Sequence, residues 1–299
     1  MDFGINFNGD LPFEKIKEGA RTAERLGFDF IWVGESIHFK HPFPIITAIA
    51  HSTKNIRVGS GIISYFFNRG LHIRKAFETL VEAYGERFAI ALAPGDFNAL
   101  RESKIEPKKP LERLKETIDE LSGSEALENT PLFVGASGPK MIEAGSKFSD
   151  GLLLNYAHPE HLKWALSHLQ KDTYTGAYAP ALLLPDKKNE KAILLASAFV
   201  AAGSNPSFQE HFSLKEEVEE VRLILKEKRY DALEEKKDFL LERFAICGDD
   251  ATIKKRIREF KKLGLNQIIF GSPVTYNLHS VEVIARFCSA KSVHRTGGL

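Results

Sequence analysis

The chain has 299 residues, of which 43% are hydrophobic and 27% are charged, and its formal net charge is +1 at pH 7. This composition predicts a globular protein with a large buried core and excludes disorder over most of the chain. The small net charge supplies no bulk field for nucleic acid or an anionic membrane, and no apolar run reaches the roughly 20 residues of a membrane span. We therefore expect neither partner.

Short apolar runs alternate with stretches of helical periodicity from the start of the chain. In the first half, the runs that predict strands are residues 3–7, 28–33, 56–63 and 88–93. The helical segments that follow them are residues 12–26, 43–50, 72–84 and 111–121. Gly27 and Gly85 stand where the first and third helices should end, because glycine is favoured just past a helix.

The second half of the chain continues the same alternation. Its strand candidates are residues 131–134, 151–155, 178–184 and 267–270, although Pro180 makes the start of the third irregular. Its helix candidates are residues 139–148, 159–169, 190–202, 251–263 and 281–287. The charged, helical stretch between Gly203 and about residue 239 contains no strand candidate and predicts an insertion at the rim of the fold.

These eight strand–helix alternations predict a single (β/α)8 TIM barrel with rim insertions. The strand candidates are apolar on both faces, as strands buried in a parallel sheet must be. Eight strict alternations favour a closed barrel over an open, doubly wound sheet. No linker or low-complexity segment divides the chain, so we expect one domain over residues 1–299.

Reactive groups of such a barrel lie in the loops that follow the strands. One of these loops, Gly135–Gly138, stands between a strand candidate and a helix opened by Pro139. It can present backbone N–H groups and a helix N-terminus to a phosphate. A plain glycine-rich turn explains the same residues, so the loop alone leaves both interpretations open.

Two carboxylates also follow strand candidates. Asp96, after Pro94 and Gly95, could contact a cofactor or cap the next segment. Glu35 could act as an acid, serve as a hydrogen-bond partner or form a salt bridge. The sequence leaves these alternatives open.

The histidines and cysteines show no metal-ligand spacing. His38 and His72 are typical of solvated or core histidines, and we predict no metal site. Cys247 and Cys288 lie far apart in the sequence, which favours reduced thiols in a cytoplasmic protein. The N-terminal residues lack the basic start and apolar stretch of a secretion signal.

Several strand-end segments form a recognisable series. In chain order they read FGINF (3–7), GFDFIWV (27–33), IRVGSGI (56–62), APGD (93–96), GASGPKM (135–141), DGLLLN (150–155), AAGSNP (201–206) and FGSP (270–273). Together they resemble the luciferase-like flavin and F420 oxidoreductases, covering nearly the whole chain. The last two segments are narrower than the superfamily and resemble its branch of archaeal F420-dependent methylenetetrahydromethanopterin reductases.

The resemblance implies that coenzyme F420 binds at the barrel mouth, with FMN as the alternative. A non-proline cis peptide of the family maps to Gly61–Ile62, whose bulge would press against the middle ring of the deazaflavin. The implied cofactor-binding residues all follow strands: they are Ser36, Ser60, Gly61, Ile62, Asp96, Gly135, Ala136, Ser137, Gly138, Asn155 and Tyr156.

Two positions depart from the family pattern. The related reductases carry a glutamate on the first strand, where this chain has Asn6, and an Asp-His pair after the second, where it has Glu35 and Ser36. Asn6 cannot exchange a proton, but it can hydrogen-bond a ring carbonyl. Asn6 and Glu35 are therefore the candidate catalytic residues, with Glu35 the remaining acid nearby.

The leading hypothesis is hydride transfer between reduced F420 and a small acceptor, such as a one-carbon pterin. The first alternative is an FMN-dependent monooxygenase of the same barrel family. The second is a cofactor-binding protein without turnover, which the departures at Asn6 and Ser36 motivate. The family also implies a homo-oligomer, with the helix at residues 43–50 in the interface.

Overall fold

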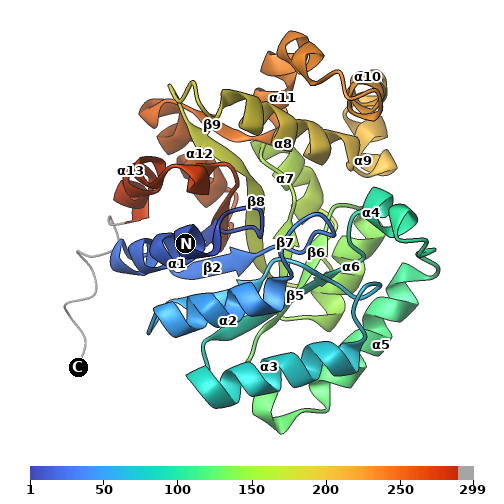
Figure 1. Cartoon of the computed structure of the whole chain (residues 1–299). Coiled ribbons are helices and arrows are strands. Elements are labelled where there is room, and N and C mark those ends of the chain that lie inside the picture. The colour runs from blue at the N-terminus through green and yellow to red at the C-terminus, as the bar shows by residue number, and fades with distance from the viewer. Residues whose placement is uncertain (289–299) are drawn as a thin grey trace.

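Eight parallel strands close into a barrel at the centre of the molecule, which we describe for residues 1–288 of a computed structural model (Figure 1). The barrel strands are β1 (Asp2–Asn6), β2 (Phe30–Val33), β3 (Arg57–Ser60), β5 (Phe88–Ala93), β6 (Leu132–Ala136), β7 (Gly151–Leu154), β8 (Tyr174–Leu183) and β10 (Gln267–Gly271). The last of them, β10, pairs with both β1 and β8 and so closes the ring. The (β/α)8 barrel predicted from the sequence is confirmed.

Helices surround the barrel and bury their apolar faces against it. The helices that pack around the strands are α1 (Phe13–Arg25), α2 (Pro42–Ser52), α3 (Gly70–Tyr84), α5 (Pro110–Ser122), α6 (Pro139–Phe148), α7 (Pro159–Leu166), α12 (Asp250–Lys262) and α13 (Leu278–Cys288). In α1, for example, Ile16, Ala20 and Ala23 recur at helical spacing and are buried. No helix within residues 1–288 is long and apolar enough to cross a membrane.

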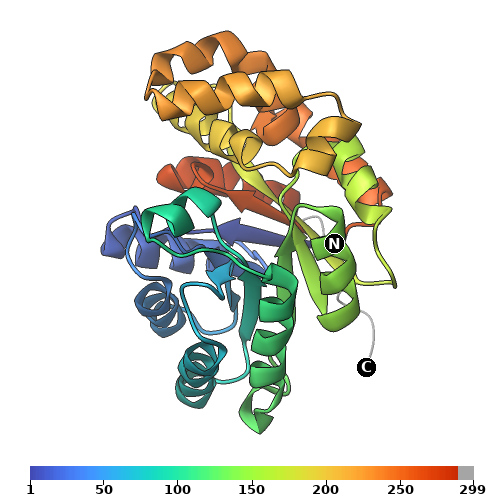
Figure 2. The same ribbon diagram turned by 90° about the vertical axis from the view of Figure 1, so that its right-hand side faces the viewer.

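The charged stretch predicted as a rim insertion forms a group of helices at one end of the barrel. The stretch forms α9 (Pro206–His211), α10 (Lys215–Lys226), η2 (Tyr230–Lys236) and α11 (Lys237–Phe244), which lie beside α8 (Glu190–Ala202), the helix predicted at residues 190–202. These yellow-to-orange helices lie above the barrel in both ribbon views (Figure 2). Because α8 directly follows β8, the group stands at the carboxyl ends of the strands, where the site was predicted.

Three local features differ from the predicted elements. The seventh barrel strand begins at Tyr174 rather than at residue 178, because Tyr174 and Thr175 pair with β7 and Gly176 pairs with both β7 and β10. The predicted strand at 56–63 ends at Ser60, and after a break β4 (Ile63–Ser64) pairs with β5. The other elements that were not predicted are short: they are α4 (Phe97–Glu102), η1 (Glu125–Leu127), β9 (Ile246–Gly248) and η3 (Val274–Tyr276).

The side chains inside the barrel pack around Trp32. Its indole is fully buried and stacks with Phe30 at a centroid distance of 5.3 Å. A Cβ at Gly59 would lie 2.5 Å from the indole, so this position requires glycine.

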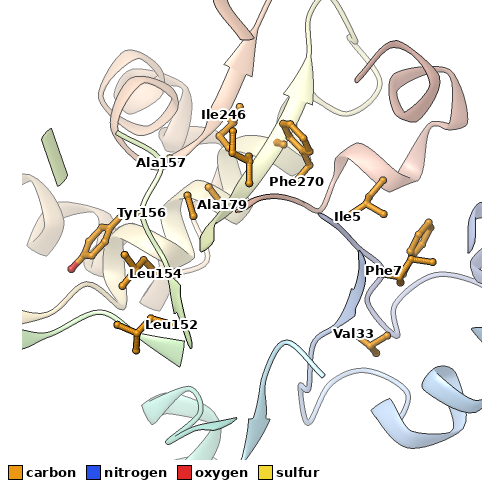
Figure 3. Close-up of a cluster of buried hydrophobic side chains, with 14 of the residues drawn as sticks. Ile5, Phe7, Val33, Leu152, Leu154, Tyr156, Ala157, Ala179, Ile246 and Phe270 are labelled. Atoms are coloured by element: carbon orange, nitrogen blue, oxygen red, sulfur yellow. The ribbon is translucent and has the colours of Figure 1, made fainter. Parts of the chain in front are cut away.

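Residues that alternate with this interior set fill the layer between strands and helices. Figure 3 shows part of that layer, in which Ile5, Leu152 and Leu154 lie on the outer side of the barrel. The alternation separates the two parts of the core. It also determines which side chains of each strand can reach the barrel mouth.

Candidate active site at the carboxyl ends of the strands

A cavity of about 380 Å³ opens at the barrel mouth between the ends of β1, β7, β8 and β10 and the helix α8. The barrel residues that line it are Asn6, Asn8, Asn155, Tyr178, Ala179, Pro180, Gly271 and Ser272, and the rim adds Phe39 and Tyr276. From α8 come Ala192, Leu195, Ala196, Phe199 and Val200. Within the described residues the lining therefore carries no charged side chain, and α8 supplies an apolar wall.

A chain of amides and a hydroxyl forms one side of this cavity. Asn6 is 1% exposed, and its Nδ2 donates to the carbonyl oxygen of Trp32 at 3.1 Å. The Ser272 hydroxyl donates to Asn6 Oδ1 at 3.5 Å and accepts from Asn8 Nδ2 at 3.3 Å. These contacts fix the orientation of the Asn6 amide and keep this side of the cavity uncharged.

The segment after β3 lies beside the end of β2, the strand that separates β3 from β1. The Gly61–Ile62 peptide is cis. Gly61 N donates to the Val33 carbonyl at 2.7 Å, and Glu35 N donates to the Ile62 carbonyl at 3.1 Å. The predicted cofactor-facing bulge is thus held on both sides by the end of β2.

The side chain of Glu35 forms hydrogen bonds with residues that follow the same segment. One carboxylate oxygen accepts from Ser64 N at 2.7 Å, and the other accepts from Asn68 Nδ2 at 2.8 Å. The Ser64 hydroxyl in turn donates to the Pro94 carbonyl at 2.5 Å. Glu35 therefore connects the loops that follow β2, β3 and β5.

The glycine-rich loop between β6 and α6 lies beside the bulge. A Cβ at Gly135 would stand 2.8 Å from Cγ2 of Ile62, which shows how closely the two segments approach. Gly138 is the N-cap of α6 and provides no side-chain hydrogen bond, so the first-turn N–H groups of this helix have no cap from that residue. The arrangement can offer backbone donors to a phosphate.

Tyr156 supports this loop from the apolar layer behind it. The residue is 3% exposed, and its ring packs beside Trp164 and Phe208. Its hydroxyl donates to the carbonyl of Ser137. Figure 3 shows the ring alongside Leu154 in the outer layer, so Tyr156 reaches the site through the backbone of the loop.

The remaining predicted residues have local partners. The Ser60 hydroxyl donates to the Ala91 carbonyl at 3.2 Å and accepts from Ala91 N at 2.9 Å, so it joins β3 to β5. Ser36 Oγ accepts from His38 N within a turn. Asp96 is exposed and caps α4, since its Oδ1 accepts from Ala99 N at 2.8 Å. The capping alternative for Asp96 is thus the one that the structure shows.

No group of three or more His, Cys, Asp or Glu residues within positions 1–288 is placed to hold a metal ion. Cys247 is a free thiol, and burial raises its pKa to about 12. The side chain of Cys288 lies outside the described residues.

Of the residues that line the cavity, only Asn6 and Asn155 were predicted site residues, and the polar side chains that were missed include Asn8, Ser272 and Tyr178. Asn8 and Ser272 stand just after β1 and β10, so their strand-end position was a usable signal. Tyr178 was missed because the predicted strand began at that residue. The observed strand begins four residues earlier and brings Tyr178 close to the mouth.

The chain is similar to known proteins over nearly its whole length. The model of a family described as luciferase-like monooxygenase matches residues 1–124 and 120–267. The chain is 26% identical to the 5,10-methylenetetrahydromethanopterin reductase of Archaeoglobus fulgidus, covering 92% of this chain and 94% of the relative. It is 27% identical to the protein of the same name from Methanolobus tindarius, with coverages of 93% and 96%.

Solved structures match over a similar length. The coenzyme F420 dependent tetrahydromethanopterin reductase from Methanopyrus kandleri superposes with a TM-score of 0.81 at 19% identity, over 95% of this chain and 97% of that one. An F420-dependent secondary alcohol dehydrogenase in complex with an F420–acetone adduct gives 0.70 at 18% identity, with coverages of 96% and 98%. At these identities the superpositions establish the shared fold.

Proposed function

This chain belongs to the luciferase-like monooxygenase family, and on that premise we propose that it is an F420-dependent oxidoreductase that transfers a hydride to a one-carbon pterin. The observation that carries the proposal is the end-to-end match to curated 5,10-methylenetetrahydromethanopterin reductases, over 92% and 93% of this chain. The uncharged cavity at the ends of β1, β7, β8 and β10, with the glycine loop at the end of the neighbouring strand β6, is the feature of the mouth that fits such a reaction.

The residues at the mouth fit a cofactor made of a flat ring system and a phosphate-bearing side chain. The loop Gly135–Gly138 and the uncapped start of α6 supply donors for a phosphate. Ile62 lies against Gly135, so a ring resting on the bulge would be adjacent to a phosphate in the loop. When bound, reduced F420 supplies the hydride.

The chain itself contributes binding, orientation and exclusion of water. The apolar face of α8 covers the cavity, which limits the access of water to a reacting pair. Asn6 presents a fixed amide that can orient a ring by hydrogen bonding but cannot supply a proton. Glu35 holds the bulge through Ser64 and Asn68, and a catalytic proton transfer from its carboxylate remains a prediction.

An anaerobic titration of the purified protein with F420 and, separately, with FMN tests the cofactor. We expect saturable absorbance and fluorescence changes with F420 and weak or absent binding of FMN. Mixing the reduced F420 complex with methylenetetrahydromethanopterin should then regenerate the absorbance of oxidised F420 without oxygen.

Other outcomes would favour the alternatives. Preference for FMN together with oxygen consumption would support a monooxygenase and overturn the proposed cofactor. Tight F420 binding without turnover on the pterin would support a cofactor-binding protein that has no reductase activity. In that case, Asn6→Glu would be the first variant to test for restored turnover.

We also propose that the protein is a cytoplasmic homo-oligomer. Leu71 on α3 is 49% exposed and Phe13 on α1 is 37% exposed, so the outer helices carry apolar side chains that a second copy could cover. The free thiol of Cys247 is compatible with a reducing compartment. Light scattering of the purified protein measures the oligomeric state, and a monomer at micromolar concentration would contradict this part of the proposal.

A further inference from the structure

Tyr178 points from β8 into the interior of the barrel. Alternation along the strand turns Ala177 and Ala179 toward the surrounding helices, whereas Tyr178 packs with the interior cluster around Trp32. The residue pairs in register with Ile269 of β10, and its ring passes close to Gly271, where a Cβ would lie 3.2 Å from Cε2. Tyr178 therefore lies at the base of the mouth, where it lines the cavity.

The hydroxyl of Tyr178 forms no hydrogen bond with residues 1–288, and the partly buried side chain lines the cavity. Three other tyrosines at or near the barrel use their hydroxyls within the protein, since Tyr156 donates to Ser137, Tyr174 to Asp2 and Tyr276 to Asp10, whereas the buried Tyr65 hydroxyl has no partner among residues 1–288. Burial raises the pKa of Tyr178 above its ordinary value. The group is therefore an O–H donor, rather than a phenolate, at any working pH.

The residues around this hydroxyl determine which kind of ligand can bind beside it. The lining within the described chain is uncharged, with the Asn6 and Asn155 amides on the barrel side and the face of α8 opposite. A charged group placed here would lose hydration without a compensating partner. An apolar, planar ring with a hydrogen-bond acceptor on its edge would satisfy both surfaces.

From this arrangement we infer that the Tyr178 hydroxyl donates a hydrogen bond to a carbonyl oxygen or ring nitrogen of an uncharged heterocycle held between the strand ends and α8. The inference rests on the proposed function, because the deazaflavin of F420 and the pterin of the acceptor both carry a pyrimidinone edge of this kind. Tyr178 is then a ligand-binding residue that orients one of these rings.

The test compares Tyr178→Phe with Tyr65→Phe. Tyr65 is the control because its hydroxyl is buried and without a partner in the described residues, and it does not line the cavity. Anaerobic titrations with F420, with methylenetetrahydromethanopterin and with FMN measure each affinity, and thermal unfolding of the ligand-free proteins gives a second readout. We expect Tyr178→Phe to weaken one ligand about five- to tenfold, and Tyr65→Phe to change none.

The pattern of the results identifies the bound ring. Weaker F420 binding alone means that Tyr178 contacts the cofactor, and weaker pterin binding alone means that it contacts the acceptor. We expect Tyr178→Phe to unfold at the same temperature as the wild type, because the hydroxyl forms no hydrogen bond within residues 1–288. A marked fall in that temperature, absent from Tyr65→Phe, would indicate a structural role and overturn the inference.

Failure of the inference is distinguishable from failure of the proposed function. If the wild type ignores F420 but binds FMN or the pterin, the proposed cofactor is wrong, and the inference is judged on the ligand that binds. If Tyr178→Phe binds every ligand as tightly as the wild type does, the inference is wrong whatever the cofactor. If the wild type binds none of the three, the assignment of this cavity to such heterocycles is wrong.

Discussion

The carboxylate of Glu35 accepts a hydrogen bond of 2.7 Å from the backbone N–H of Ser64 and thereby ties the end of β2 to the segment that follows the Gly61–Ile62 peptide. Its second oxygen accepts from Asn68 Nδ2 at 2.8 Å. Both oxygens are thus engaged within the protein. This arrangement is suited to holding the loop in place, which is the hydrogen-bonding role among the three alternatives that the sequence left open for Glu35.

Replacing Glu35 tests which role matters. We expect Glu35→Ala to lower the free energy of unfolding by about 1–3 kcal/mol, because the Ser64 N–H loses its acceptor. Hydrogen exchange of residues 61–68 should accelerate, and the affinity for F420 should fall. Glu35→Gln keeps one acceptor oxygen, which can face the Ser64 N–H, so it should retain more of the exchange protection and the affinity than Glu35→Ala does. If Glu35→Gln instead folds and binds F420 normally but abolishes turnover, the carboxylate acts as an acid.

Gly59 has no room for a side chain because Trp32 occupies the space. A Cβ there would lie 2.5 Å from the indole, which is itself fully buried among Phe30 and Phe133. We expect Gly59→Ala to lower the free energy of unfolding by about 1–3 kcal/mol through overpacking, as measured by urea denaturation. Gly203→Ala is the control, because Gly203 has φ −82° and is exposed. Equal stability of the two variants would show that the barrel interior can rearrange around Trp32.

Much of the fold was predictable because each strand–helix unit carries its own local signals. Apolar runs, helical spacing and a glycine past the helix end are properties of short segments, so units such as β1–α1 were recognisable without tertiary information. The misplaced start of β8 had a different cause. Gly176 has weak strand propensity, and it becomes a strand residue by pairing with neighbours on both sides.

The position of the candidate site was predictable from the sequence, but the hydrogen-bond partners of its side chains were not. Strand ends had to meet at one mouth, so Asn6 and Asn155 were expected there and do line the cavity. Whether a carboxylate caps a helix, as Asp96 does, or braces a loop, as Glu35 does, depends on neighbours distant in sequence. The same holds for Tyr178, whose inward position follows from a strand register that the sequence did not reveal.

Asn6 stands where the related reductases carry a glutamate, and its contacts predict how a carboxylate at this position would change the stability of the fold. Its Nδ2 donates to the Trp32 carbonyl at 3.1 Å, and the residue is 1% exposed. Asn6→Asp replaces that donor with an oxygen facing a carbonyl, so we expect a loss of about 2–4 kcal/mol in the free energy of unfolding at pH 7. Because protonation restores a donor, the loss should shrink at pH 5. A loss that does not depend on pH would contradict this account.

His161 occupies an aromatic cluster beneath the rim helices, where neither ring nitrogen has a partner within residues 1–288. Phe208 and Phe212 each lie 4.7 Å from its ring by centroid. Burial, with smaller contributions from His158, Arg243 and Arg256, lowers its pKa from 6.5 to about 3. The imidazole is therefore neutral in the folded protein near pH 5, whereas in the unfolded chain it is mostly protonated.

The sign of the pH effect follows from that difference. Between pH 6.5 and 3 the unfolded state binds one more proton at His161, so the wild type should lose about 1.4 kcal/mol of stability per pH unit relative to His161→Phe. The phenyl ring removes two buried, unpartnered nitrogens, so the variant should be at least as stable at pH 7. Urea denaturation at pH 7, 6, 5 and 4 measures both effects, with the exposed His72→Ala as the control. Parallel curves for the wild type and His161→Phe would mean that the buried imidazole titrates normally, as it would if water entered the cluster and hydrated its nitrogens.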